Sequence, residues 1–225
     1  MYAQKKINKD FFKVWSPEMA YVLGFFAADG YITVNKRGGQ YWCIQITDKK
    51  LLYSIKKSLN SEHRISVRFP KKENESVKYR IQVGSIEMCN DLRKLGFFER
   101  KTKSLAIPNI PKKHFSHFVR GYFDGDGNIW RGEVHKERKT RHEVLLMVFT
   151  SCSHEFLANL YHRLSILDIK GGSLYRSKKK EFSRLQYSTK DALKLYKFMY
   201  NGMNTSELFL ERKKCVFESY IALRL

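Results

Sequence analysis

The chain is poor in cysteine and proline, and it has no long apolar segment. It holds only 4 cysteines and 4 prolines among 225 residues. The cysteines stand too far apart for a Cys-x-x-Cys zinc site, so we expect reduced thiols in core or strand positions, in a reducing compartment. The strongest apolar run, residues 20–28, is far too short to cross a bilayer, and nothing resembles a secretory signal.

Acidic residues are also scarce, which leaves the chain strongly basic. It carries 43 Lys and Arg against 22 Asp and Glu, a formal net charge of +21 spread over both halves. A folded protein that holds so much like charge usually binds a polyanion. Nucleic acid fits better than a membrane surface, because no basic amphipathic anchor stands out. Hydrophobic residues (43%) and aromatic residues (14%) exclude a wholly disordered chain.

One nine-residue pattern occurs twice. It reads VLGFFAADG at residues 22–30 and VRGYFDGDG at residues 119–127. Each copy predicts the last part of a helix that is apolar almost all round and therefore buried. Ser16 followed by Pro17 predicts the start of the first helix. The glycine at the end of each copy predicts a left-handed residue that ends the helix.

Small residues four positions apart form a stripe along each predicted helix. They are Gly24 and Ala28 in the first copy, and Gly121 and Gly125 in the second. Such stripes let two helix backbones approach closely, so we expect the two helices to pair. Pairing would place Asp29 beside Asp126 at helix C-termini, where a carboxylate is unfavourable unless a cation offsets it. A single Asp-Gly pair would suggest an ordinary turn, but two matched copies predict a divalent metal site.

The rest of the sequence indicates an internal duplication. In each half the pattern runs motif helix, two strands, helix, two strands, helix. The tetrapeptide RIQV at residues 80–83 recurs as RLQY at 184–187, and FERK at 98–101 recurs as LERK at 210–213. We therefore predict an α+β fold with two pseudo-symmetric αββαββα halves around paired motif helices. The halves are residues 1–105 and 115–225, joined by a proline-containing linker at 106–114.

The predicted strands carry polar faces that suit DNA. If the motif helices pair about a pseudo-twofold axis, two antiparallel sheets form a DNA-binding saddle that can lie in the major groove. Arg suits guanine, Gln suits adenine, and Ser or Thr suits either. Exposed strand faces are also polar in proteins that bind no DNA, so each residue alone fits both interpretations. The predicted DNA contacts are Gln45, Thr47, Arg64, Arg68, Lys78, Arg80, Gln82, Thr150, Tyr175, Arg184, Gln186 and Ser188.

The two motifs resemble those of the LAGLIDADG homing endonucleases, in the single-chain form with two motifs. The resemblance implies that Asp29 and Asp126 bind the catalytic metal, Mg²⁺ or a substitute such as Mn²⁺. It also implies that the main-chain carbonyls of Ala28 and Gly125 help to bind it. The copies differ at Asp124, which replaces Ala27, and we assign Asp124 no catalytic role.

The family also has a basic residue near each active site. Its position corresponds best to Lys101 and Lys213, which share a Glu-Arg-Lys setting, although Lys103 and Lys214 lie close by. A polar residue that organises water in the family would correspond to Asp48 in the first half and Ser153 in the second.

These inferences predict a monomeric, metal-dependent endonuclease that makes a double-strand break in a long, near-palindromic DNA target. The chain lacks the terminal Cys or Ser and His-Asn of self-splicing elements, which favours a free-standing, intron-encoded enzyme. An intron RNA-binding maturase and a non-catalytic DNA-binding protein are the alternatives, and paired aspartates facing a polyanion count against the second. We expect no membrane association and an intracellular setting: bacterial or archaeal cytoplasm, a phage, or an organelle.

Overall fold

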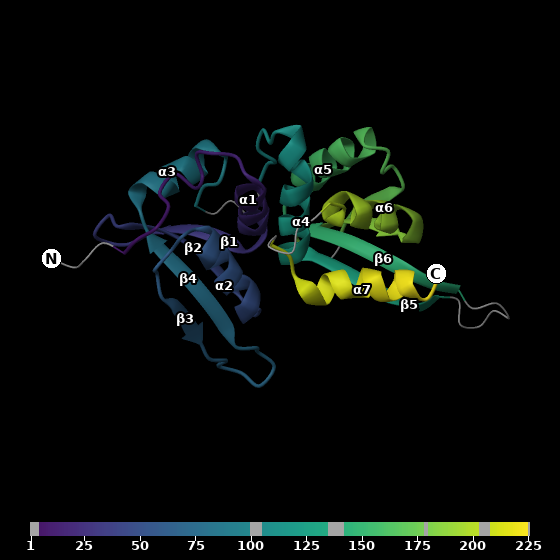
Figure 1. Cartoon of the computed structure of the whole chain (residues 1–225), viewed down its shortest axis with the longest axis horizontal. Helices are drawn as coiled ribbons and strands as arrows, with labels where there is room; N and C mark the ends of the chain where they lie inside the picture. The colour runs from purple at the N-terminus through teal and green to yellow at the C-terminus, as the bar shows by residue number, and fades with distance from the viewer. Residues whose placement is uncertain (1–4, 100–104, 135–141, 178–179, 203–207, 225) are drawn as a thin grey trace.

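Two similar halves lie side by side, with the motif helices at their junction (Figure 1). The computed structural model describes residues 5–99, 105–134, 142–177, 180–202 and 208–224. The first half contains α1 (Pro17–Asp29), β1 (Gly30–Val34), β2 (Gln40–Ile46), α2 (Lys49–Ser58), β3 (Ile65–Arg68), β4 (Lys78–Gly84) and α3 (Ile86–Lys94). The second half contains η1 (Lys112–His114), α4 (Phe115–Asp126), β5 (Gly127–Val134), β6 (His142–Ser151), α5 (His154–Ile166), β7 (Gly172–Arg176), β8 (Ser183–Ser188), α6 (Thr189–Tyr200) and α7 (Glu211–Ala222).

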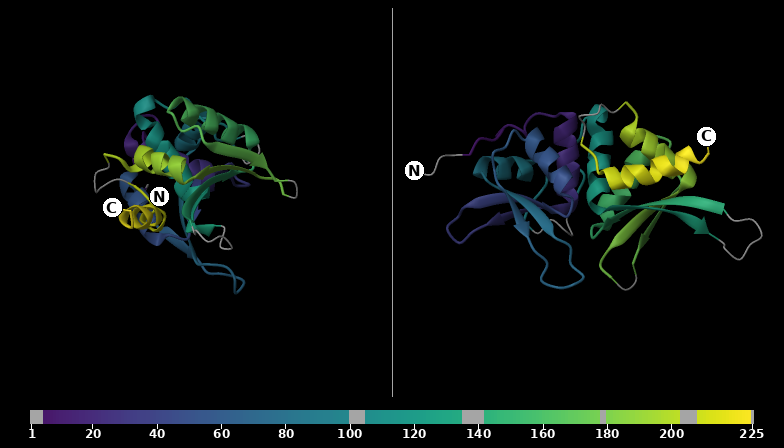
Figure 2. Two further views of the ribbon diagram at one scale, coloured as in Figure 1. Left: turned by 90° about the vertical axis from the view of Figure 1, so that its right-hand side faces the viewer. Right: turned by 60° about the horizontal axis from the view of Figure 1, so that its bottom comes forward.

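Each half has one four-stranded antiparallel sheet with the same strand order. The orders are β1-β2-β4-β3 and β5-β6-β8-β7. The helices cover one side, and the two sheets open on the other (Figure 2, right). The predicted α+β class and the αββαββα order of both halves are confirmed. The second half also has α7, which the sequence analysis did not predict.

The motif helices pack directly against each other. The Ser16 side chain caps α1 by accepting a hydrogen bond from the Met19 amide at 3.1 Å, as predicted. A Cβ atom added at Gly24 would overlap the carbonyl oxygen of Phe118, and one added at Gly121 would overlap that of Tyr21. The small-residue stripes therefore permit backbone contact, as the sequence indicated.

The prediction of a left-handed glycine at the end of each motif is wrong. Gly30 and Gly127 both have φ of −86° and extended backbones, and they are the first residues of β1 and β5. Each glycine is needed for space instead, because an added Cβ would overlap the ring of Phe26 or Phe123. The helix therefore passes directly into a strand, and the motif's carboxylate lies at that corner.

The apolar faces of the helices and sheets form the core. In β2, Trp42, Ile44 and Ile46 are buried on the face that packs against the helices. Cys43 and Cys89 are buried as expected, but Cys152 and Cys215 are exposed. The expectation of core or strand positions is wrong for those two, because Cys152 lies between β6 and α5, and Cys215 lies on an exposed part of α7.

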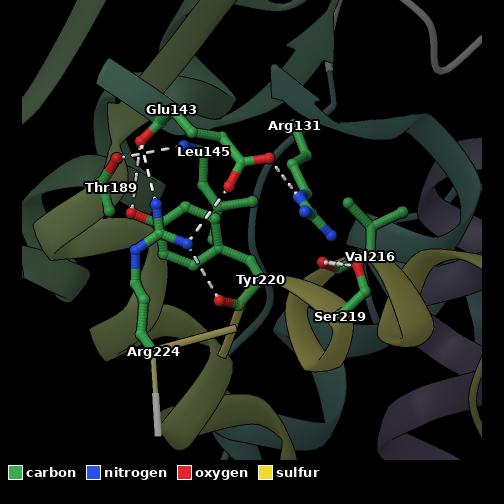
Figure 3. Close-up of polar contacts among 8 residues, drawn as sticks. All are labelled: Arg131, Glu143, Leu145, Thr189, Val216, Ser219, Tyr220 and Arg224. Atoms are coloured by element: carbon green, nitrogen blue, oxygen red, sulfur yellow. Dashed lines mark hydrogen bonds and ion pairs between the residues drawn. The ribbon is translucent and has the colours of Figure 1, made fainter. Parts of the chain in front are cut away.

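The unpredicted helix α7 is fixed to the second sheet at its C-terminal end (Figure 3). The Glu143 carboxylate accepts hydrogen bonds from Arg131 Nε at 2.6 Å and from Arg224 Nη1 at 3.2 Å. The Arg224 guanidinium lies 3.6 Å from the ring centroid of Tyr220. Among the residues that the structure describes, no helix has the length and hydropathy needed to span a membrane.

Candidate active site and nucleic-acid surface

Two carboxylates meet at the paired ends of the motif helices. Asp29 and Asp126 are the last residues of α1 and α4, and both are exposed although their helices are largely buried. A Cβ atom added at Gly125 would lie 3.5 Å from Asp29 Oδ2, so Asp29 reaches the end of the opposite helix. Burial raises the pKa of Tyr122, and the negative charges of Asp126 and Asp29 raise it further. The structure thus brings the two predicted metal ligands together.

Lys213 lies against the main chain at the end of α4. Its Nζ donates hydrogen bonds to the carbonyl oxygens of Phe123 (2.6 Å), Asp124 (2.9 Å) and Gly127 (2.5 Å). The residue is 4% exposed, and burial lowers the pKa of its ammonium to about 8 against the opposing effect of Asp124. The ammonium therefore neutralises the negative end of the helix that carries Asp126.

Asp124 connects both motif helices to α7. Its Oδ2 accepts hydrogen bonds from the Tyr21 hydroxyl at 2.7 Å and from the Leu210 amide at 2.8 Å. Leu210 is the N-cap residue of α7, the helix that carries Lys213. Burial raises the pKa of Asp124 to about 6. Asp124 therefore positions the start of α7, a function that the sequence analysis missed although the change from Ala27 signalled it.

Arg120 is a second buried polar residue specific to the second motif. It replaces Leu23 of the first motif and is 1% exposed. Its guanidinium donates to the carbonyl oxygens of Leu208 at 3.0 Å and Met199 at 2.6 Å. These bonds hold the chain on both sides of residues 203–207, immediately before α7. Arg120 was not among the functional residues predicted from the sequence.

A pocket of about 430 Å³ lies beside Asp29. Its lining includes three predicted DNA-contacting residues and one basic residue that was not predicted: Gln45, Thr47, Lys78 and Arg212. Arg212 is exposed, whereas the neighbouring Lys213 is buried. Arg212 therefore joins Lys78 as a basic side chain that the structure places in the pocket of the first carboxylate. Lys101 and Lys103 lie outside the described residues.

The two predicted water-organising positions are helix N-caps. Asp48 accepts a hydrogen bond from the Leu51 amide at 2.7 Å, and it also lines the pocket beside Asp29. Ser153 caps α5 and donates to the carbonyl oxygen of Leu105 at 2.9 Å. Ser153 is buried, so the two positions correspond in the fold but differ in access to solvent.

The donor atoms suit a hard cation. Carboxylate oxygens from Asp29 and Asp126, with the carbonyls of Ala28 and Gly125, are ligands that Mg²⁺ prefers. No third acidic, histidine or cysteine side chain joins them within the part of the chain that the structure describes. A cation held by these atoms would therefore have only part of its coordination shell from the protein, and phosphate oxygens and water could complete it.

The predicted DNA contacts lie on the outward faces of the sheets. In the first sheet, Arg80 pairs with Gln45 and with Ser66, on the face opposite the buried Ile44. Arg68, Lys78 and Gln82 share that face, while Thr47 and Arg64 lie next to the ends of β2 and β3. In the second sheet, the register brings five predicted residues onto the equivalent face: Thr150, Tyr175, Arg184, Gln186 and Ser188.

Sequence comparison finds a family-model match within the first half of the chain. Residues 16–96 match the family model of the LAGLIDADG-like domain. A region of 102 residues (44% of this chain) is 32% identical to a "Probable translation initiation factor IF-2" of Thermococcus kodakarensis, over 8% of that protein. A longer region of 189 residues (80% of this chain) is 23% identical to an uncharacterized protein of Methanocaldococcus jannaschii, and it covers 64% of that protein. The chain thus spans less than two thirds of either relative.

Solved structures match nearly the whole chain. The LAGLIDADG meganuclease I-AabMI, bound to uncleaved DNA, is 18% identical with a TM-score of 0.60, covering 93% of this chain and 90% of that one. The homing endonuclease I-LtrWI, bound to target DNA, is 15% identical with a TM-score of 0.62, covering 96% and 90%. I-SmaMI, bound to uncleaved DNA with calcium ions, is 13% identical with a TM-score of 0.58, covering 93% and 90%. At these identities the likeness establishes the fold.

Proposed function

Since residues 16–96 belong to the LAGLIDADG family and the whole chain has the fold of the LAGLIDADG meganucleases, we propose that the protein is a site-specific DNA endonuclease. One observation carries the proposal: Asp29 and Asp126 lie exposed at the paired helix ends, between two sheets whose outward faces are polar. A duplex lying along both sheets would present one strand to each carboxylate. The reaction is a double-strand break in a long target, and homing of an intron is the biological role that we propose for it.

Asp29 and Asp126, with the carbonyls of Ala28 and Gly125, would hold Mg²⁺, and Mn²⁺ would substitute. When bound, such a metal activates water and stabilises charge on the phosphate and on the leaving oxygen. The I-SmaMI complex with calcium ions is a precedent for divalent cations on this fold. The two exposed carboxylates provide the negative charge that a cation requires at this corner.

Basic residues supply the remaining charge near the reacting phosphates. We propose that Arg212, in the pocket beside Asp29, contacts the phosphate of the first site, and that its guanidinium offsets developing charge. We retain Lys213 as the basic residue of the second site, where its ammonium stabilises the helix end that carries Asp126. Lys101, the repeat counterpart of Lys213, is our candidate in the first half.

A single chain provides both half-sites, so we propose that the monomer is the active form. The polar residues on the outward face of each sheet then contact one half of a near-palindromic target in the major groove. Intron RNA is the alternative partner, because a strongly basic surface binds either nucleic acid at low ionic strength.

The test is a cleavage screen over a large duplex library in Mg²⁺. We expect the wild type to cut a small family of related sites, and Asp29→Asn or Asp126→Asn to abolish double-strand cleavage while binding persists. Asp168→Asn changes an exposed carboxylate that pairs with Lys194, and it should cut normally. Full cutting by the Asp29→Asn/Asp126→Asn double variant would refute the proposal. Tight binding without cutting by the wild type would support the maturase or the non-catalytic DNA-binding protein.

A further inference from the structure

The two sheets can be compared position by position, because their registers match. The glycine that ends each motif opens the first strand of each sheet and gives a common origin. Counted from that origin, three equivalent pairs of outward positions are polar in both halves. The equivalent pairs are Gln45 with Thr150, Arg80 with Arg184, and Gln82 with Gln186.

At other positions, the outward faces of the two sheets differ in charge and polarity. Three cationic residues of the first half correspond to uncharged residues of the second: Arg64 to Ser173, Arg68 to Ser177, and Lys78 to Phe182. Three other positions on the first two strands carry two hydroxyl side chains and a buried cysteine in the first half, but apolar side chains in the second: Thr33 to Trp130, Tyr41 to Leu146, and Cys43 to Val148. The first sheet is therefore more cationic, and the second is more apolar.

We define the apolar patch as Trp130, Leu146 and Val148. Trp130 and Leu146 form a cross-strand pair, and Val148 lies two residues along β6 on the same face. Trp130 is 43% exposed, and its indole lies against Gly132, where an added Cβ would overlap the ring. Leu146 and Val148 are half-buried. The patch therefore presents a flat indole flanked by two aliphatic side chains.

The surroundings of the patch indicate what it contacts. Val148 pairs with Gln186, so the apolar patch is continuous with the polar residues that we assign to base edges. In the major groove of duplex DNA, the C5 methyl of thymine is the largest apolar group on a base edge, and the groups that form hydrogen bonds there are donors or acceptors. An apolar surface on this face is thus most complementary to thymine.

We propose that the second half recognises its half-site through thymine methyl groups on the apolar patch, whereas the first half relies on charged and polar contacts. The proposal rests on the proposed function, since it requires duplex DNA on the outward faces. It makes the two half-sites chemically unequal. One is rich in thymine opposite the patch, and the other is held more strongly through phosphates.

The experiment selects bound duplexes from a random library with the full-length chain, then replaces thymine by uracil in one half-site at a time. Uracil lacks only the methyl group, so base pairing is retained. We expect affinity to fall about fourfold per contacted methyl in one half-site, and to change less than twofold in the other. Trp130→Ser and Val148→Thr should each reduce the uracil penalty. Thr33→Ser, at the first-half position equivalent to Trp130, should leave it unchanged.

A uracil response that is equal in both half-sites, or that persists unchanged in Trp130→Ser and Val148→Thr, would overturn the inference and leave the proposed endonuclease intact. Selection of target sequences that contain no thymine in either half-site would also overturn the inference and leave the proposed endonuclease intact. If no duplex is selected, both the inference and the proposed function fail. Because Trp130 and Thr33 are exposed, these variants should keep the thermal stability of the wild type, which checks that folding is unaffected.

Discussion

A buried ammonium group closes the end of α4. The last carbonyls of a helix lack intrahelical donors, and they carry the negative end of its dipole. Lys213 supplies three hydrogen bonds and a positive charge there, and it lies near the buried carboxylate of Asp124. The first motif has Ala27 in place of Asp124 and Leu23 in place of Arg120. Only the second motif therefore has charged side chains in the core, and these side chains need polar or charged partners there.

We predict that Lys213→Met will destabilise the protein strongly. The substitution leaves the Asp124 carboxylate buried without its nearby cation, which typically costs about 3–5 kcal/mol. Urea unfolding of the two proteins at neutral pH measures the difference. Lys214→Met is the matched control: Lys214 makes an i,i+4 pair with Glu218 at 2.9 Å, and its loss should cost less than about 1 kcal/mol. Equal losses for the two variants would contradict the role of Lys213 at the helix end.

Some site residues were predictable from the sequence and others were not. Asp29 and Asp126 follow from the repeated pattern, because helix pairing brings the ends of both copies together. The burial of Lys213 could not be predicted, since a lysine in a basic chain has no local pattern that distinguishes it from a solvated one. The role of Gly30 could not be predicted for a different reason. A glycine can be required for a left-handed backbone or for the space that a Cβ would fill, and the sequence does not show which of the two applies.

The helix α7 was missed because its starting signal is not local. Its N-cap residue, Leu210, makes no side-chain capping bond; the Leu210 amide instead donates to Asp124, far away in the sequence. Its buried residues Phe217 and Tyr220 alternate with charged positions and give a weak periodic pattern. In contrast, the start of α2 has a local signal, because Asp48 caps the helix and the buried residues Leu51, Leu52 and Ile55 follow directly.

The C-terminal end of α7 should respond to acid. The hydrogen bond from Arg131, and then that from Arg224, hold the pKa of Glu143 below its ordinary value of 4.5. A lowered pKa adds stability above the unfolded value, and this stability is lost as pH falls through the folded pKa. We therefore predict that Glu143→Gln lowers the Tm by a few degrees at pH 7, and that the difference closes below about pH 4.5.

Thermal unfolding from pH 7 down to the acid range measures this effect. Glu73→Gln changes an exposed glutamate that makes no ion pair in the described structure, and it should follow the wild type throughout. A Glu143→Gln deficit that stays constant into the acid range would show that lost packing, not the carboxylate charge, destabilises the variant.

At the scale of the whole molecule, both the net positive charge and the arrangement of the two sheets favour binding of a DNA duplex. A formal net charge of +21 accompanies two sheets that face the same side, so a bound duplex would release many counterions. Internal duplication predicted this architecture correctly, because the small-residue stripes of the two motif helices favour pairing of the halves through those helices. The difference in charge and polarity between the two outward faces could not be predicted from the duplication, since it depends on the strand register.

We predict a steep salt dependence of binding to the selected target. Affinity should fall by about three orders of magnitude or more between 50 and 200 mM salt, if six to ten phosphates are neutralised. Arg68→Ala should reduce the slope of log affinity against log salt by about 1. Gln82→Ala lies on the same face and should weaken binding without changing that slope. A shallow slope for the wild type would indicate that the excess charge serves some other purpose.

The hydrogen bond from Tyr21 to Asp124 limits how the halves can be exchanged in engineered chimeras. Tyr21 belongs to the first half and is fully buried, while its acceptor belongs to the second. A foreign second half with an apolar residue at that position would leave the hydroxyl without a partner, at a cost of about 1–3 kcal/mol. The halves are therefore not independent modules: a graft must transfer both residues together, or replace the tyrosine by phenylalanine when its acceptor is left behind.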